Sequence, residues 1–268
     1  MRWTRRRALL GAFTAVVLGA SGVTPLAGAL DPVTDGVDTR VVLPSGRAMV
    51  LHVPPELRRS PRAGAGRPAM VVLHGLRSNP SDTVAATAFD ELADRDGVLV
   101  AYPEGVRRSF NAGTCCGEAV PARVDDVGFL AEVVAALRAR GADRVSVVGF
   151  SNGGMMAYRF ACERPDLVDT VGVLAGSLQI PRCDGPVRAL HLHGELDDVV
   201  PYAGRDFDPR LRTFLRAVGT IPEAARGSAL TIRRVPGLPH RWPEQGDPVD
   251  AVAEFWAFAR MGERPAGS

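Results

Sequence analysis

A serine stands between two glycines in the segment 149–153, which reads GFSNG and fits the pattern G-x-S-x-G. Residues 144–150 are rich in valine, and the residues after Ser151 have the periodicity of a helix. A turn that passes so tightly from strand to helix crowds the positions two residues before and after the serine, and it favours glycine there. Ser151 is therefore the candidate nucleophile, with its hydroxyl exposed above the edge of a sheet.

A serine hydroxyl needs a general base at neutral pH, and histidine is the usual one. For a nucleophile on a strand-turn-helix, the acid and then the histidine are expected to follow the serine along the chain. Four of the five histidines precede any suitably placed acid: His52, His74, His191 and His193. His240 lies in a loop beyond the last expected strand, and it is the predicted base.

The acid should be a carboxylate just past a strand between these two residues. The segment 191–202, HLHGELDDVVPY, offers Glu195, Asp197 and Asp198, and spacing alone does not choose among them. His191 and His193 are two residues apart on the preceding strand, so with Asp197 they could resemble a metal site. We expect them instead to form hydrogen bonds near the acid loop, and we predict no metal and no cofactor.

Backbone N–H groups near the serine should hold a developing oxyanion. One donor is expected from Asn152, which follows the nucleophile at the start of a helix. The second should come from the loop LHGLRSNP, residues 73–80, where we choose Leu76.

The rest of the chain must position these residues, and its strand and helix patterns alternate. After a hairpin at residues 39–54, we expect strands at 69–75, 98–105, 144–150, 168–176, 187–194 and 229–235. Helices are expected at 81–97 with Ser81 as N-cap, and at 124–141, 152–165, 209–219 and 248–261. This alternation predicts an α/β fold with a mostly parallel sheet, helices on both faces and a site at the carboxyl ends of the strands.

The first 29 residues have the pattern of a secretory signal: an arginine cluster, a short apolar stretch and the small-x-small site Ala27-Gly28-Ala29. The segment Thr4-Arg5-Arg6-Arg7-Ala8-Leu9 also resembles a twin-arginine signal, with alanine where phenylalanine is usual. Cleavage near Ala29 would remove four of the 32 basic residues and leave 28 against 30 acidic ones. That balance gives no basic surface for nucleic acid, and we expect no stable membrane insertion after cleavage.

An exported chain with four cysteines is expected to form two disulfides. The cysteines are Cys115, Cys116, Cys162 and Cys183, and the sequence permits three pairings. We disfavour the pair Cys115–Cys116, because Cα atoms about 3.8 Å apart are closer than ordinary disulfide geometry allows.

Several motifs together resemble the extracellular esterases known as polyhydroxybutyrate depolymerases, which are close to feruloyl and acetylxylan esterases. The resemblance runs from about residue 68 to 260. The motifs are VVLHG, AYPEG, FNAGTCCG followed by VDDVGFL, GFSNGGMMAYRFACERP, HGELDDVVPYAG and PHRWP. It implies a single α/β-hydrolase domain at residues 30–268 without a large lid.

In this family the acid corresponds to Asp197 and the base to His240, with Asp198 as the alternative acid. The resemblance also implies that Asn111 and Trp242 line the substrate pocket, and that Cys115 or Cys116 bonds to Cys162 or Cys183.

The expected function is that of a secreted, extracellular serine esterase. No linker and polymer-adhesion domain follow the last expected helix, so we expect soluble esters or short 3-hydroxyalkanoate oligomers as substrates. A feruloyl or acetylxylan esterase is the alternative within this class. A secreted peptidase and a binding protein with an inactive hydrolase scaffold are the alternatives outside it.

Overall fold

The computed structural model describes residues 38–59, 66–183, 187–208, 213–216, 218 and 229–261. The expected signal, residues 1–29, lies outside these ranges.

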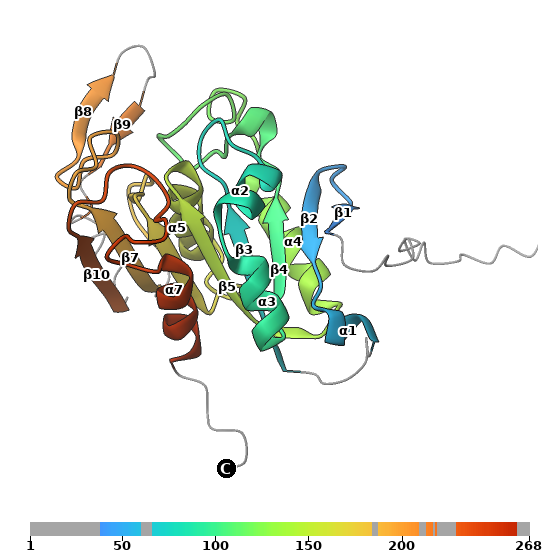
Figure 1. Ribbon diagram of the computed structural model, residues 1–268. Coiled ribbons are helices and arrows are strands. Elements are labelled where there is room, and N and C mark those ends of the chain that lie inside the picture. The colour runs from blue at the N-terminus through green and yellow to red at the C-terminus, as the bar shows by residue number, and fades with distance from the viewer. Residues whose placement is uncertain are drawn as a thin grey trace, which may run out of the picture. The chain divides into compact units, whose positions relative to one another are not determined.

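The central element is an eight-stranded sheet with the strand order β1-β2-β4-β3-β5-β6-β7-β10 (Figure 1). β1 pairs antiparallel with β2 and β2 antiparallel with β4, whereas every pair from β4 to β10 is parallel. The strands are β1 Thr39–Val42, β2 Ala48–His52, β3 Arg67–Leu73, β4 Leu99–Pro103, β5 Ala142–Phe150, β6 Thr170–Leu174, β7 Arg188–Gly194 and β10 Ala229–Val235. The predicted mostly parallel sheet is confirmed.

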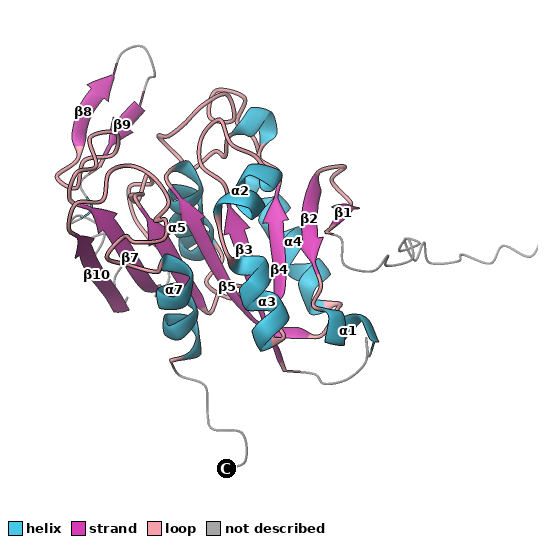
Figure 2. Ribbon diagram, in the orientation of Figure 1, coloured by secondary structure: helices cyan, strands magenta, loops and turns pink. Residues whose placement is uncertain are grey.

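Helices cover both faces of the sheet (Figure 2). They are α1 Pro55–Arg59, α2 Pro80–Ala86, α3 Phe89–Asp96, α4 Asp126–Arg138, α5 Asn152–Glu163 and α7 Ala251–Arg260, with a 3-10 turn, η1, at Val106–Arg108. The alternation of β3 shows how the two layers form: Ala69, Val71 and Leu73 pack with α4 and α5, and Met70 and Val72 with α3 and α7. A strand buried on both sides must be apolar at every position, which explains its unbroken run of hydrophobic residues.

The single helix expected at 81–97 is two helices, α2 and α3, and its predicted N-cap is wrong. Asn79 caps α2 instead, because its side-chain oxygen accepts the N–H of Asp82 at 3.0 Å. Pro80 then occupies the first helical turn, where its missing N–H costs nothing. The chain leaves the helix at Thr87 in an extended conformation, and Phe89 begins α3 fully buried.

The helix expected at 209–219 is wrong in its described part. Thr213–Leu215 forms strand β9, which pairs antiparallel with β8, Arg205–Asp208. Threonine and phenylalanine favour strands, and pairing with a neighbouring segment overrides a weak helical pattern in so short a run. In the described part of 195–228, β8 and β9 are the longest regular elements, and no large lid is evident there.

No helix in the described ranges combines the length and the apolar character that crossing a bilayer requires.

A charged cluster joins β2 to the start of β1 and to α3. His52 Nδ1 lies 2.9 Å from Asp38 Oδ1, and His52 Nε2 lies 2.9 Å from Asp94 Oδ1. Asp90 Oδ2 lies 3.5 Å from the same ring and accepts the Tyr102 hydroxyl through its other oxygen. Burial opposes a charge on this ring, but the bonds to Asp94 and Asp38 outweigh it and raise the pKa of His52.

A histidine whose pKa is raised by folding stabilises the folded state below its unfolded pKa of about 6.5, and this stabilisation is lost as the pH rises through the higher folded value. We therefore expect His52→Gln to lower the free energy of unfolding by about 1–2 kcal/mol at pH 5.5 and by much less at pH 9. Denaturant melts at the two pH values measure the difference. An equal loss at both would show that the charge on His52 contributes nothing.

Candidate active site

Ser151 lies on the turn between β5 and α5 with an unusual backbone conformation, φ 52° and ψ −120°. The glycines of the motif permit this turn. A Cβ at Gly149 would overlap the backbone of Gly153, and a Cβ at Gly153 would overlap the carbonyl of Leu73 in β3. The turn is held by the Ser151 N–H, which donates to Leu174 O at 2.9 Å.

The structure brings Ser151, His240 and Asp197 into one hydrogen-bonded chain. The Ser151 hydroxyl donates to His240 Nε2 at 2.9 Å, and His240 Nδ1 donates to Asp197 Oδ2 at 2.8 Å. Each residue follows a different strand, β5, β7 or β10, at the carboxyl end of the sheet. This arrangement can transfer a proton from the hydroxyl to the imidazole and stabilise the imidazolium that forms.

The loop after β7 distinguishes Asp197 from Asp198. The Asp197 side chain is fully buried, and its Oδ1 accepts the N–H groups of Val199 at 3.0 Å and Val200 at 2.7 Å. These bonds fix the orientation of the carboxylate and aim its other oxygen at His240. Asp198, by contrast, is exposed.

Phe150 packs against His240, the candidate base, and the sequence analysis did not predict this contact. Its ring lies 4.9 Å from the His240 ring, and its other side faces Gly75, where a Cβ would meet it. Phe150 stands directly before the serine in G-x-S-x-G, a position that any residue can occupy. Its large aromatic side chain was the signal that could have indicated a packing role there.

Leu76 lies on a loop fixed by a buried histidine. His74 Nδ1 donates to Gly75 O at 2.8 Å, and His74 Nε2 accepts the N–H of Gly105 at 3.0 Å. Burial lowers the pKa of His74, which is consistent with a neutral ring that both donates and accepts. The loop is therefore held to the end of β4 before it turns at Leu76.

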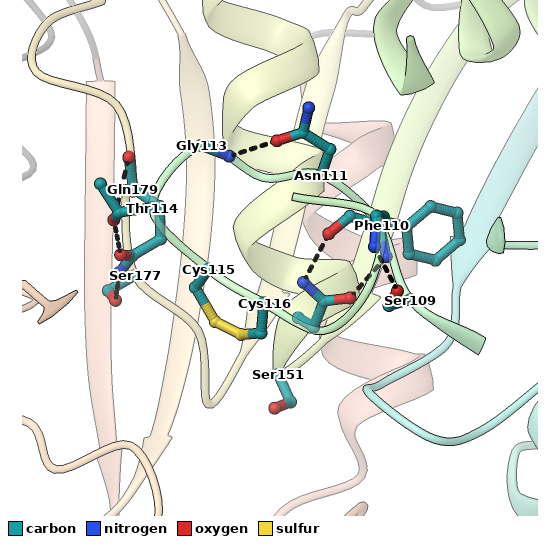
Figure 3. The surroundings of a disulfide bond; sticks show 12 residues. Ser109, Phe110, Asn111, Gly113, Thr114, Cys115, Cys116, Ser151, Ser177 and Gln179 are labelled. Atoms are coloured by element: carbon teal, nitrogen blue, oxygen red, sulfur yellow. Dashed lines mark hydrogen bonds between the residues drawn. A yellow bond between two sulfur atoms is a disulfide. The ribbon is translucent and has the colours of Figure 1, made fainter. Parts of the chain in front are cut away.

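Asn152 holds the segment Ser109–Ala119 through the backbone of Phe110, and Figure 3 shows Phe110, Cys115 and Cys116 of this segment near Ser151. The side-chain oxygen of Asn152 accepts the N–H of Phe110 at 2.8 Å, and its amide donates to Phe110 O at 2.9 Å. A Cβ at Gly117 would overlap the Leu76 side chain, so the same segment also packs against the expected oxyanion loop. The fully buried side chain of Asn152 thus has a structural task that the sequence reasoning did not assign.

The expected disulfide pairing is wrong. Cys115 bonds to Cys116, and Cys162 bonds to Cys183. The argument against the adjacent pair took a short Cα separation as an obstacle, yet the pair forms with its Cα atoms 3.1 Å apart across a cis peptide bond. Figure 3 shows the Cys115–Cys116 bridge on the side of its loop that faces Ser151.

The two expected pocket residues, Asn111 and Trp242, both contact other parts of the protein. Asn111 donates its side-chain amide to Val124 O at 3.0 Å, and in Figure 3 it points away from Ser151. Trp242 packs between Phe89 and Phe255, with ring centroids 6.0 and 6.3 Å away. Both contacts shape the loops around the site, and binding of substrate by either residue stays a prediction.

His191 and His193, which with Asp197 could have suggested a metal site, form hydrogen bonds with other groups. All four ring nitrogens of His191 and His193 have partners, so neither ring offers a free nitrogen to an ion. Among the described residues, Asp38, His52 and Asp90 also gather ligand-type atoms within 4.8 Å. Both ring nitrogens of His52 are within hydrogen-bond distance of carboxylates there, Nδ1 of Asp38 and Nε2 of Asp94.

Comparison with known proteins finds a matching family model. Residues 53–183 match the family model described as "Esterase PHB depolymerase", and this stretch contains the serine motif and the segment FNAGTCCG. The chain therefore carries an esterase PHB depolymerase family-model domain over residues 53–183.

Its curated relatives carry esterase names. The chain is 35% identical over 188 residues to "Putative esterase NocK" of Nocardia uniformis subsp. tsuyamanensis, covering 66% of this chain and 54% of that protein. It is 28% identical over 161 residues to feruloyl esterase B of Thermothelomyces thermophilus, covering 57% of this chain and 50% of that protein. This chain thus spans about half the length of these relatives.

Solved structures confirm the α/β-hydrolase-like fold. Acetyl xylan esterase from Aspergillus awamori matches with a TM-score of 0.58 and 16% identity, covering 83% of this chain and all of that one. S-formylglutathione hydrolase from Agrobacterium tumefaciens matches with a TM-score of 0.54 and 16% identity, covering 80% and 87%.

Asp197 and Asp198 are neighbours, so substituting each in turn tests which one orients His240. Asp197→Asn keeps the shape of the side chain but loses the charge that holds the His240 tautomer, so with an ester substrate we expect kcat to fall about 10⁴-fold. Asp198→Asn should change kcat by less than about twofold, because the side chain is exposed. Steady-state kinetics of both folded variants provide the measurement. A comparable loss in the Asp198 variant would transfer the role of the acid to that residue.

Proposed function

We propose that this chain is a secreted serine esterase with Ser151 as nucleophile, His240 as general base and Asp197 as the acid that orients it. The observation that carries the proposal is the hydrogen-bonded chain of these three side chains at a strained turn. Strain of about 1–3 kcal/mol persists only where the surroundings enforce it, and it is concentrated at functional sites.

The reaction would proceed by acyl transfer in two steps. Ser151 Oγ attacks the ester carbonyl carbon while its proton passes to His240 Nε2, and the imidazolium then gives that proton to the departing alcohol. Water repeats the sequence on the acyl-enzyme and releases the acid. The N–H groups of Leu76 and Asn152 would hold the oxyanion, each contributing about 10²- to 10³-fold in rate.

For the substrate we propose soluble carboxylic esters, including short 3-hydroxyalkanoate oligomers. The family description supports this choice, and the names of the relatives favour feruloyl or acetylxylan esters as the alternative. The Cys115–Cys116 bridge and its loop lie beside Ser151 and would form one wall of the cleft.

We also propose that the protein is exported and cleaved near Ala29. The arginine-rich apolar leader and the two disulfides support this, because disulfides persist outside the reducing cytosol. Expression of the full chain in a bacterial host should release a protein whose first residue, by N-terminal sequencing, is at or near Leu30. Retention of the intact leader would contradict the proposal.

Removing the nucleophile is the direct test of the reaction. Ser151→Ala should abolish hydrolysis of p-nitrophenyl butyrate, by about 10⁶-fold in kcat, because no other group can form the acyl-enzyme. Ser45→Ala, at the exposed β1–β2 turn, is the matched control and should keep wild-type turnover. Retained activity in the Ser151 variant would eliminate this residue as nucleophile.

Two further measurements distinguish the alternatives. A fluorophosphonate probe should label the wild type at Ser151 and leave Ser151→Ala unlabelled, whereas an inactive binding scaffold would react in neither form. Turnover of methyl ferulate, acetylated xylan, a 3-hydroxybutyrate dimer and a fluorogenic peptide then ranks the substrate classes. Preference for the peptide would identify a peptidase.

A further inference from the structure

A second hydrogen-bonded chain lies behind the candidate site and is fully buried. The Tyr158 hydroxyl lies 2.8 Å from His191 Nδ1, and His191 Nε2 lies 2.9 Å from His193 Nδ1. His193 Nε2 lies 2.8 Å from Val200 O. All three side chains are at most 1% exposed, and the two imidazole planes lie within 3° of parallel. Buried polar groups so completely paired form a rigid unit.

The direction of every bond in this chain follows from its last acceptor. A carbonyl oxygen only accepts, so His193 Nε2 carries a proton and donates it to Val200 O. In a neutral ring His193 Nδ1 is then an acceptor, and His191 Nε2 must donate to it. By the same argument His191 Nδ1 accepts, and the Tyr158 hydroxyl donates. A proton added to His193 would set two N–H groups against each other, and one added to His191 would force the Tyr158 hydroxyl to turn from donor to acceptor.

Burial favours the neutral rings that this order requires. It lowers the pKa of His191 well below its usual value, and His193 lowers it further. Burial also lowers the pKa of His193, although the bond to Val200 O and the charge of Asp197 act in the opposite direction. Burial raises the pKa of the Tyr158 hydroxyl, which therefore remains a donor.

The chain joins the elements that carry two members of the triad. Tyr158 lies on α5, the helix that Ser151 precedes, two turns along from the nucleophile. At the other end the chain reaches Val200, whose N–H donates to Asp197 Oδ1 at 2.7 Å. His193 Nε2 also lies 3.5 Å from Asp197 Oδ2, the oxygen that accepts from His240. The helix of the nucleophile and the loop of the acid are thus connected through two strand residues of β7.

We propose that Tyr158, His191 and His193 are positioning residues, which hold the Asp197–Val200 loop in place through a hydrogen-bonded chain of fixed direction. The inference rests on the proposed esterase function for its kinetic test, but the chain itself can be tested without any substrate. It assigns roles to two histidines that touch neither the nucleophile nor the base.

The kinetic test uses graded changes at the chain. His193→Leu removes the donor to Val200 O, and we expect kcat to fall about 10- to 100-fold with KM changed by less than about twofold, because a small displacement of the acid misaligns His240. His193→Gln, whose amide can donate to Val200 O and accept from His191, should recover most of the lost kcat. Tyr158→Phe removes only the first donor and should lower kcat about three- to tenfold.

Thermal melts of each variant separate positioning from simple packing. If the variants lose stability but each folded molecule keeps wild-type kcat, or if His193→Gln is no better than His193→Leu, the proposal is overturned. Wild-type turnover and its loss in Ser151→Ala are measured in the same series. Failure of those two results would reject the esterase function instead.

Nitrogen-15 NMR of the histidine side chains in the unmodified protein tests the bond order directly, even if the leucine variant does not fold. We expect His191 and His193 both as neutral Nε2–H tautomers from about pH 6 to pH 9. An Nδ1–H tautomer at either residue, or titration of either ring within this range, would overturn the proposed direction of the chain.

Discussion

The conformation of Ser151 is the constraint on which the site depends, because a side chain at φ 52° and ψ −120° can be held only where its neighbours have almost no volume. The neighbouring positions are Gly149 and Gly153, and the nearest obstacles are backbone atoms of the turn and of β3, which cannot move aside. β5 is paired on both sides, by β3 and β6, so the turn is anchored to the most constrained part of the sheet. The position of the hydroxyl beyond the end of β5, within reach of His240, is a consequence of this packing.

Two polar residues near the turn, Asn152 and His74, each connect two segments of the site. Asn152 presents its backbone to the expected oxyanion and its side chain to Phe110, so the start of α5 and the neighbouring loop are fixed by one residue. His74 links the expected oxyanion loop to the segment after β4 in the same way. Because these groups already have partners before substrate arrives, little reorganisation remains for the reaction itself.

Much of the fold and the site was predictable from the sequence, for physical reasons that the residues make visible. The alternation of buried strands and amphipathic helices specifies the sheet, and the order of serine, acid and histidine leaves only His240 as the candidate base, which the structure brings to 2.9 Å from Ser151. The choice of Asp197 over Asp198 was not predictable from spacing, since it depends on which carboxylate meets the N–H groups of Val199 and Val200. Those contacts exist only after the loop has folded.

The errors come from local conformations that a pattern does not encode. The peptide bond between Cys115 and Cys116 is cis, which no residue spacing indicates, and the helix expected at 209–219 yields to pairing between β8 and β9. Ser81 and Asn79 are both good capping residues, and the proline between them decides the outcome by starting the helix one residue earlier.

The bridge between adjacent cysteines has a consequence for how this scaffold can change. Since Cys115 is bonded to its own neighbour, the loop beside the nucleophile has no disulfide to the body of the molecule, and Cys162–Cys183 fastens α5 independently. The loop is held by hydrogen bonds, among them those between Asn152 and Phe110 and that between Thr114 and Gln179. Residues of the loop that carries Cys115 and Cys116 can therefore be substituted without breaking the Cys162–Cys183 disulfide. Such substitutions would alter the surroundings of Ser151 and leave the hydrophobic core unchanged.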